Sequence, residues 1–103
     1  MEFVETSLFS GIRENYFDDE QFHRLQLFLL DRPDAGNVIQ GSGGVRKLRW
    51  GLQRTGKRGG ARVIYYWMSR DSQILFLTVY TKNEAKDLSA ETIAAMRALV
   101  KEL

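Results

Sequence analysis

Basic side chains crowd the middle of this sequence, and they suggest its chemistry. Between Ala35 and Arg70 there are eight of them and no Asp or Glu. The eight are Arg46, Lys47, Arg49, Arg54, Lys57, Arg58, Arg62 and Arg70. A cluster of one sign concentrates phosphate-bearing ligands, so nucleic acid is the first partner to consider. The alternative is a solvated surface with no partner.

Five residues have the types and positions that RNA cleavage would need. Lys47 and Arg49 alternate on one predicted strand, Arg62 opens the next, and Tyr80 and Lys82 end the third. RNA supplies its own nucleophile, the 2′-hydroxyl, so a protein need only orient the phosphate, stabilise developing negative charge and assist two proton transfers. Arginine suits the first two tasks, and a lysine among other cations could move a proton. The alternative interpretations are ordinary solvent-facing strand residues for Lys47 and Arg49, and half-buried packing for Tyr80.

The other basic residues of the block indicate phosphate contacts rather than catalysis. Lys57 and Arg58 lie between glycines in a predicted loop, which would hold catalytic groups loosely. The candidates for RNA binding are Arg46, Arg54, Lys57, Arg58 and Arg70.

The sequence lacks the residues that metal or cysteine chemistry would need. The chain has no cysteine, which excludes a thiolate zinc site, and one histidine, His23. His23 lies beside the apolar stripe of a predicted helix, where a surface histidine is the simpler interpretation. There is no Walker sequence for phosphate binding. We therefore predict no metal and no cofactor.

Length and composition fit one domain spanning residues 1–103. A chain of 103 residues with 44% hydrophobic side chains can form a single core. No segment approaches the roughly 18 consecutive apolar residues of a transmembrane helix, and the N-terminus lacks a signal-peptide pattern. We expect a cytoplasmic protein without a membrane partner.

Helical patterns stand at both ends of the chain. Phe3 and Val4 are compatible with a short strand, and a short helix capped by Thr6 or Ser7 is expected to end at Arg13. Asp18, with Gln21 three residues later, predicts the start of a second helix, and Asp-Arg-Pro at 31–33 predicts its end. Ser89 predicts the start of a third helix. Its apolar stripe comprises Ile93, Met96, Leu99, Val100 and Leu103.

Three segments between the helices predict strands. Residues 45–50, 62–68 and 74–80 are rich in β-branched and aromatic side chains and would form consecutive antiparallel strands. On the first of them, Lys47 and Arg49 share one face. Helices packed on one face of such a sheet give an α+β domain whose opposite face is partly open to solvent.

Three motifs, in this order, resemble the RelE/ParE superfamily of toxins. They are GGVRKLRW at 43–50, GKRGGARVIYYW at 56–67 and LTVYTKNEAKDLS at 77–89. The set is most similar to the HigB-like branch of RelE toxins from bacterial type II toxin–antitoxin modules. The resemblance covers about 60% of the chain.

This resemblance implies a fold and an activity. The fold is a RelE-like compact α+β domain, with N-terminal helices packed on a small curved antiparallel sheet and a C-terminal helix. RelE toxins enter the ribosomal A site and cut translated mRNA without a metal, leaving a 2′,3′-cyclic phosphate. We therefore expect a ribosome-dependent mRNA endonuclease, or mRNA interferase, that inhibits translation through 2′-OH attack.

The resemblance also implies protein partners. Besides the ribosome and its mRNA, a cognate antitoxin would neutralise the toxin. In the HigB branch this is often a helix-turn-helix, HigA-like protein, through which the toxin meets operator DNA indirectly. The antitoxin would use acidic or helical segments near the cationic surface, or would dock elsewhere and bar ribosome entry by bulk.

Carried over residue by residue, the resemblance assigns roles to four basic side chains. Arg62 matches the arginine that opens the central strand and contacts the scissile phosphate. Lys47 and Arg49 match the basic pair of the preceding strand, and Lys82 matches the basic residue beyond the next one. RelE toxins tend to carry a catalytic tyrosine in the C-terminal segment, but the matching EAKDLS has none. Lys47, Lys82 or Tyr80 would then have to serve as the general base.

Two other functions stay open at this point. A non-catalytic RNA- or ribosome-binding module would use the same cations only to hold phosphates. A ParE-like toxin would inhibit DNA gyrase and leave RNA intact, although the retained set of Lys47, Arg49, Arg62 and Lys82 argues against it.

Overall fold

The described residues form a five-stranded sheet flanked by three α-helices. The computed structural model describes residues 1–52, 57–85 and 87–103, and for residues 52 and 57–59 it describes the backbone only. The elements, in chain order, are β1 (Glu2–Glu5), α1 (Ser7–Ile12), the 3-10 helix η1 (Arg13–Asn15), α2 (Asp19–Asp31), β2 (Asn37–Val38), β3 (Arg46–Leu52), β4 (Lys57–Met68), the 3-10 helix η3 (Ser69–Asp71), β5 (Gln73–Thr81) and α3 (Ala90–Lys101).

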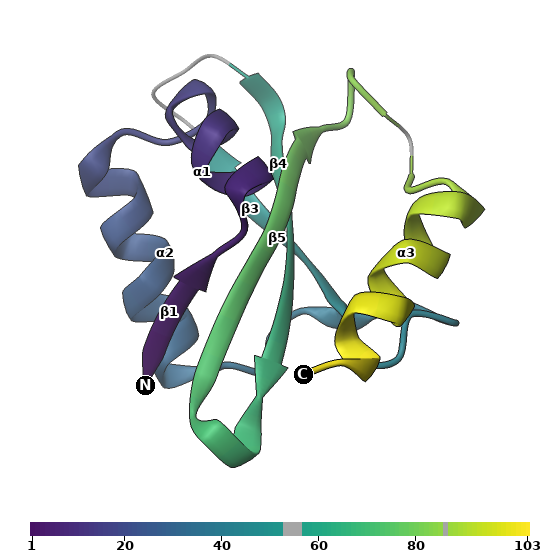
Figure 1. The fold of residues 1–103 in the computed structure, drawn as a ribbon. Coiled ribbons are helices and arrows are strands. Elements are labelled where there is room, and N and C mark those ends of the chain that lie inside the picture. Colours follow the sequence, from purple (N-terminus) through teal and green to yellow (C-terminus); the bar gives the residue numbers. More distant parts are fainter. Residues whose placement is uncertain (53–56, 86) are drawn as a thin grey trace.

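The sheet has the strand order β1-β5-β4-β3-β2. Neighbours from β2 to β5 pair antiparallel, whereas β1 runs parallel to β5 at one edge. Helices α1 and α2 lie on one face and α3 lies on the other (Figure 1). The predicted α+β class is confirmed. Three features go beyond the prediction: the parallel pairing of β1 with β5, the two-residue edge strand β2, and the cover that α3 gives to part of the face expected to be open.

Each α-helix begins at a side-chain cap that the sequence supplies. The Thr6 hydroxyl accepts a hydrogen bond from the Phe9 amide at 3.1 Å, and the Ser89 hydroxyl accepts one from the Thr92 amide at 3.1 Å. Asp18 forms the predicted capping box for α2. The predicted starts of α2 and α3 are therefore confirmed. None of the helices in the described residues has the length and apolar character needed to cross a membrane.

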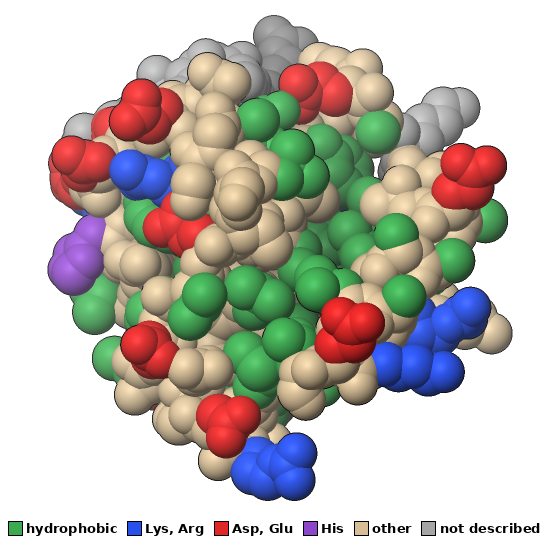
Figure 2. All heavy atoms as spheres, viewed as in Figure 1, with side chains coloured by type: hydrophobic (Ala, Val, Ile, Leu, Met, Phe, Trp, Pro, Cys, Tyr) green, Lys and Arg blue, Asp and Glu red, His purple; other side chains and the backbone are tan. Residues whose placement is uncertain are grey.

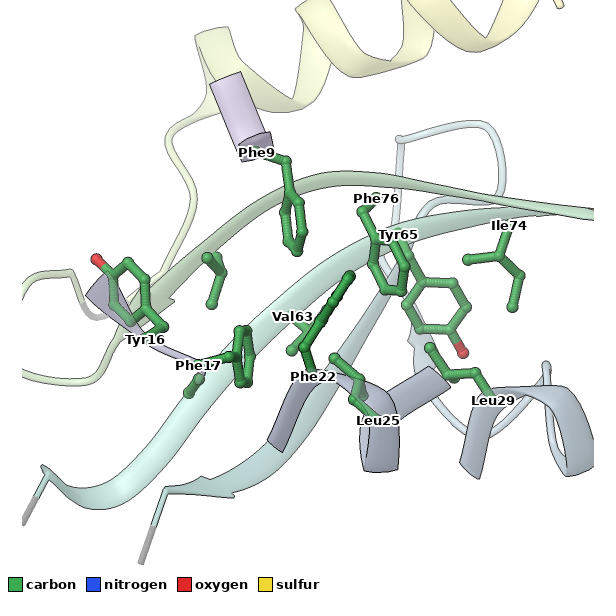
Figure 3. Close-up of a cluster of buried hydrophobic side chains, with 12 residues drawn as sticks. Phe9, Tyr16, Phe17, Phe22, Leu25, Leu29, Val63, Tyr65, Ile74 and Phe76 are labelled. Atoms are coloured by element: carbon green, nitrogen blue, oxygen red, sulfur yellow. The ribbon is translucent and has the colours of Figure 1, made fainter. Parts of the chain in front are cut away.

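The main core lies between the sheet and helices α1 and α2. Three phenylalanine rings meet there: Phe9 and Phe22 contact Phe76 of β5, with ring centroids 4.9 and 5.4 Å apart respectively. Leucines of α2 fill the space toward β4 (Figure 3). This packing fixes one face of the central strands toward the helices, so alternate residues of the same strands must face the other way.

Tyr65 ties the end of α2 to the middle of the sheet. Its ring is fully buried, and its hydroxyl donates to the Pro33 carbonyl at 2.8 Å and accepts from the Gly36 amide at 2.9 Å. A Cβ atom at position 36 would lie 2.9 Å from the Tyr65 ring, so glycine is required for this close approach.

A β-bulge in β5 changes which residues face α3. Ile64 pairs with Thr78, but the next residue, Tyr65, pairs with Phe76, so Leu77 is an extra residue on β5. Without it, strict alternation would place Tyr80 on the same face as Phe76. With it, Tyr80 faces α3 and belongs to the second hydrophobic cluster.

Replacing Tyr65 with Phe should destabilise the protein by about 1–3 kcal/mol, because the Pro33 carbonyl and the Gly36 amide lose a buried partner. Tyr66→Phe, on the opposite face of β4 and only partly buried, is the matched control. Urea denaturation of the three proteins measures the difference. Equal loss of stability in the two variants would contradict the role of the Tyr65 hydroxyl.

Candidate functional site

Arg49, Arg62 and Tyr80 form one row across three neighbouring strands. Arg49 of β3 pairs with Arg62 of β4, and Arg62 pairs with Tyr80 of β5. Directly opposed residues in antiparallel strands have Cβ atoms roughly 5 Å apart. The sheet therefore brings together three of the five residues that the sequence indicated for catalysis. We call this set the cationic row.

The cationic row faces the side of the sheet that carries α3. On β4, Val63 and Tyr65 pack into the core under α1 and α2, so Arg62 and Ile64 point to the opposite face. Ile64 accordingly packs with Met96 of α3. The row is thus held by backbone pairing and by the two cores, and its members need no contact with one another to stay aligned.

Gly60 shapes the approach of β4 to Arg62. The register between β3 and β4 shifts between Trp50 and Leu52, and Gly60 adopts a φ of +68° there. A Cβ atom at position 60 would lie 2.2 Å from the Trp50 carbonyl oxygen, which no side chain could tolerate. This glycine lets the strand enter regular pairing at Ala61, directly before Arg62.

Lys47 lies on the same face, two residues before Arg49, and pairs with Ile64. Its ammonium nitrogen is 3.4 Å from Oδ1 of Asp87, which precedes α3. The Leu88 backbone N–H donates to the same oxygen at 2.8 Å. Together the Leu88 amide and Lys47 hold the pKa of Asp87 below its usual range. No pattern in the sequence predicts this contact, because the two residues are 40 positions apart and meet only when α3 folds over the sheet.

Tyr80 offers a buried hydroxyl at the end of the cationic row. The residue is 8% exposed, and its hydroxyl has no hydrogen-bond partner among the described residues. Burial raises the pKa of Tyr80, Asp87 raises it further, and the Arg62 guanidinium lowers it. The hydroxyl therefore keeps its proton at neutral pH, and its oxygen is enclosed by neighbouring side chains in this structure.

Lys82 lies in a turn at the end of β5 that is closed by a hydrogen bond between Thr81 and Glu84. It is exposed and stands two residues after Tyr80. The Glu84 carboxylate accepts hydrogen bonds from the Thr81 amide at 2.8 Å and from the Tyr16 hydroxyl at 2.7 Å. Glu84 thus fastens this turn to the N-terminal helical layer, and Lys82 lies at the same end of β5 as the cationic row.

Two of the predicted RNA-binding residues lie away from the cationic row. Arg46 pairs with Tyr65 on the α2 face, and its guanidinium donates to the Asp34 and Gly36 carbonyls at 3.1 and 2.8 Å. Arg70 is exposed in η3, at the other end of β4, roughly 20 Å along the strand from Arg62. The structure does not bring either residue to the site.

The other predicted phosphate contacts fall where less is described. Arg54 lies outside the described residues. The prediction of a loop at Lys57 and Arg58 was wrong, because β4 begins at Lys57 rather than at Arg62; the side chains of both residues are outside the described part of the chain. Within the described part, no group of three or more His, Asp and Glu side chains is arranged to hold a metal ion.

An apolar groove adjoins the site between β5 and α3. It has a volume of about 420 Å³ and is lined mainly by apolar side chains. These include Leu8, Leu77, Leu88, Met96 and Leu99, together with Tyr80. Figure 2 shows hydrophobic side chains gathered in this hollow, between α1 and α3. Because Tyr80 belongs to both, the groove and the cationic row form one continuous surface.

Comparison with known proteins assigns this fold and this sequence to a family. Residues 35–103, which include the cationic row and α3, match the family model described as the RelE toxin of the RelE/RelB toxin–antitoxin system. The chain belongs to the RelE toxin family.

Two solved structures share the fold of this RelE-family chain at 13% sequence identity and a TM-score of 0.56. One is the crystal structure of the intact E. coli RelBE toxin–antitoxin complex, for which the match covers 78% of this chain and 94% of that one. The other is an arginine-to-alanine double mutant of E. coli RelE in the free state, with 99% and 97% covered. The predicted RelE-like fold is confirmed.

The tyrosine that anchors the Lys82 turn in this RelE-family chain should have a measurable alkaline signature. Burial, with help from the Glu84 carboxylate, raises the pKa of Tyr16 to about 12 from an ordinary value of 10.0. The unfolded chain ionises first, so the stability that this tyrosine contributes is present below pH 10 and is lost between pH 10 and 12. Over that window the unfolding free energy should fall more steeply in the wild type than in Tyr16→Phe. Parallel slopes in pH-dependent urea melts would contradict this.

Proposed function

We propose that this chain is the toxin of a type II toxin–antitoxin module and acts as a ribosome-dependent mRNA endonuclease. The observation that carries the proposal is the in-register row of Arg49, Arg62 and Tyr80, with Lys47 on the adjacent pair. Two guanidinium groups and a phenol, held on one rigid sheet, could bind a single scissile phosphate and stabilise the negative charge that develops on it. Membership of the RelE toxin family supports the same proposal.

The proposed chemistry uses the 2′-hydroxyl of the RNA as the nucleophile and needs no metal. Arg62, at the centre of the row, and Arg49 beside it would bind the nonbridging phosphate oxygens and stabilise the charge that grows on them. Tyr80 would donate from its buried, unpartnered hydroxyl after the side chains that enclose it move aside. Lys47 and Lys82 flank the row and would complete its positive field. The products would be a 2′,3′-cyclic phosphate and a 5′-hydroxyl end.

We further propose the partners that this activity requires. The ribosome would present the mRNA, so the protein would act in the cytoplasm. A cognate antitoxin would neutralise it, as the partnership in the E. coli RelBE complex suggests. The order and spacing of the three sequence motifs favour the HigB-like branch, with a helix-turn-helix, HigA-like antitoxin that alone contacts operator DNA. The cationic row and the apolar groove are two different surfaces that such an antitoxin could cover.

A non-catalytic RNA- or ribosome-binding module is the second candidate function. It is favoured by one observation, the absence of tyrosine from the EAKDLS segment at 84–89. Both functions predict binding that weakens as salt rises, since both neutralise phosphates. Only the endonuclease cuts RNA. Inhibition of DNA supercoiling by purified gyrase, with mRNA left intact, would instead support a ParE-like toxin.

Replacing Arg62 with Ala should reduce mRNA cleavage at least about 100-fold, because the central cation of the row is lost from the charged transition state. The measurement is the appearance of new mRNA 5′ ends in a reconstituted translation mixture. Arg24→Ala is the matched control, since Arg24 is exposed on α2 and pairs with Glu20.

In this experiment the control should cleave like the wild type, with ends at A-site codons. Circular dichroism would establish that both variants are folded. Intact message with wild-type toxin in excess would reject the endonuclease and leave the binding module. Normal cleavage by the Arg62 variant would reject the role of the cationic row.

A further inference from the structure

Among the described residues, one carboxylate contacts the lysine beside the cationic row. Asp87 is exposed at the start of α3, and its Oδ1 atom contacts the Lys47 ammonium at 3.4 Å and accepts from the Leu88 amide at 2.8 Å. Both contacts use the same oxygen. The other oxygen, Oδ2, makes no hydrogen bond within the described part of the chain. One oxygen thus orients the carboxylate, and the second is open to a ligand.

The groups facing Asp87 come from three strands. Lys47 belongs to β3 and touches it, while Tyr80 of β5 lies close enough for the Asp87 charge to raise the pKa of its hydroxyl. Arg62 of β4 acts on the same hydroxyl with the opposite sign. Asp87 therefore borders the place where a phosphate held by the cationic row would lie.

Cleavage by 2′-hydroxyl attack needs a proton acceptor, and the cationic row itself supplies none. Guanidinium and ammonium groups carry their protons at neutral pH. Burial raises the pKa of Tyr80, so that residue also keeps its proton. His23 lies on α2, which packs on the opposite face of the sheet. Among the described residues, Asp87 is the carboxylate that contacts Lys47 on the cationic side, and the contacts with Leu88 and Lys47 keep it ionised.

We propose that Asp87 is the general base of this site, accepting the proton of the attacking 2′-hydroxyl on Oδ2. The proposal rests on the endonuclease function and deepens it. In the step, the O2′–H proton passes to Asp87, the O2′–phosphorus bond forms and the phosphorus–O5′ bond breaks. The leaving O5′ takes a proton from water, because the Tyr80 hydroxyl is enclosed in this structure. Asp87 then releases its proton to solvent, so the site is restored without any other reactant.

An electrostatic role for Asp87 makes the opposite prediction. If the carboxylate served only as a counter-ion for Lys47, its removal would strengthen the attraction of the site for RNA and would leave cleavage unchanged or faster. A general base contributes roughly 100- to 10,000-fold to rate. The two roles therefore differ in the sign of the effect on the rate.

The test compares wild type, Asp87→Asn and Asp87→Glu in single-turnover cleavage of mRNA on programmed ribosomes. Asp71→Asn, an exposed aspartate in η3 at the other end of the sheet, is the matched control. The Asp87→Asn rate should fall at least about 100-fold while ribosome binding is kept or tightened. Asp87→Glu should recover part of the rate, and the control should cleave normally.

The pH dependence of the cleavage rate gives a second test, because a purely structural role of Asp87 would not change it. Between pH 6 and 8.5 the wild-type rate should be flat, because Asp87 is ionised throughout. In Asp87→Asn, where hydroxide must take the proton, the residual rate should rise about tenfold per pH unit.

The outcomes separate this inference from the function on which it rests. No cleavage by wild type overturns both. Cleavage by wild type, with an Asp87→Asn rate within about threefold of it or faster, overturns the general base alone and leaves the endonuclease standing.

Discussion

The register of β4 between its two neighbours is the constraint on which the candidate site depends. Antiparallel pairing sets Arg62 opposite Arg49 on one side and opposite Tyr80 on the other. Two local irregularities make this possible: the extra residue Leu77 in β5 turns Tyr80 to the α3 face, and Gly60 brings β4 into register after the shift near Trp50. Backbone hydrogen bonds and two apolar cores thus hold like charges side by side, which the cations could not do themselves.

Much of this arrangement follows from local features of the sequence. Caps at Asp18 and Ser89 define where helices start, because their side chains satisfy amides within the same turn. Strand alternation places Lys47 and Arg49 on one face, and β-branched and aromatic runs mark the three central strands. The candidate catalytic residues could therefore be chosen, and three of them placed on neighbouring strands, from types and spacing alone.

What the sequence could not predict depends on contacts between distant segments. The bulge at Leu77 has no local signature, and β1 joins the sheet only because β5 offers it a parallel edge. From the sequence, Arg46 looks like one more phosphate-binding cation of the block. In the structure its guanidinium instead donates hydrogen bonds to backbone carbonyls of the segment that follows α2. Asp87 looks like part of an ordinary helix start until α3 packs over the sheet and brings it to Lys47. Each case is settled by tertiary packing rather than by propensity.

The central claim is that Arg49 and Arg62 act on one phosphate as a unit. A double-mutant cycle on single-turnover mRNA cleavage, with Arg49→Ala, Arg62→Ala and the double variant, tests it most directly. If the two side chains share one phosphate, the double variant should lose far less than the product of the two single losses. A loss equal to that product would show that the arginines work independently and would contradict the account of the cationic row.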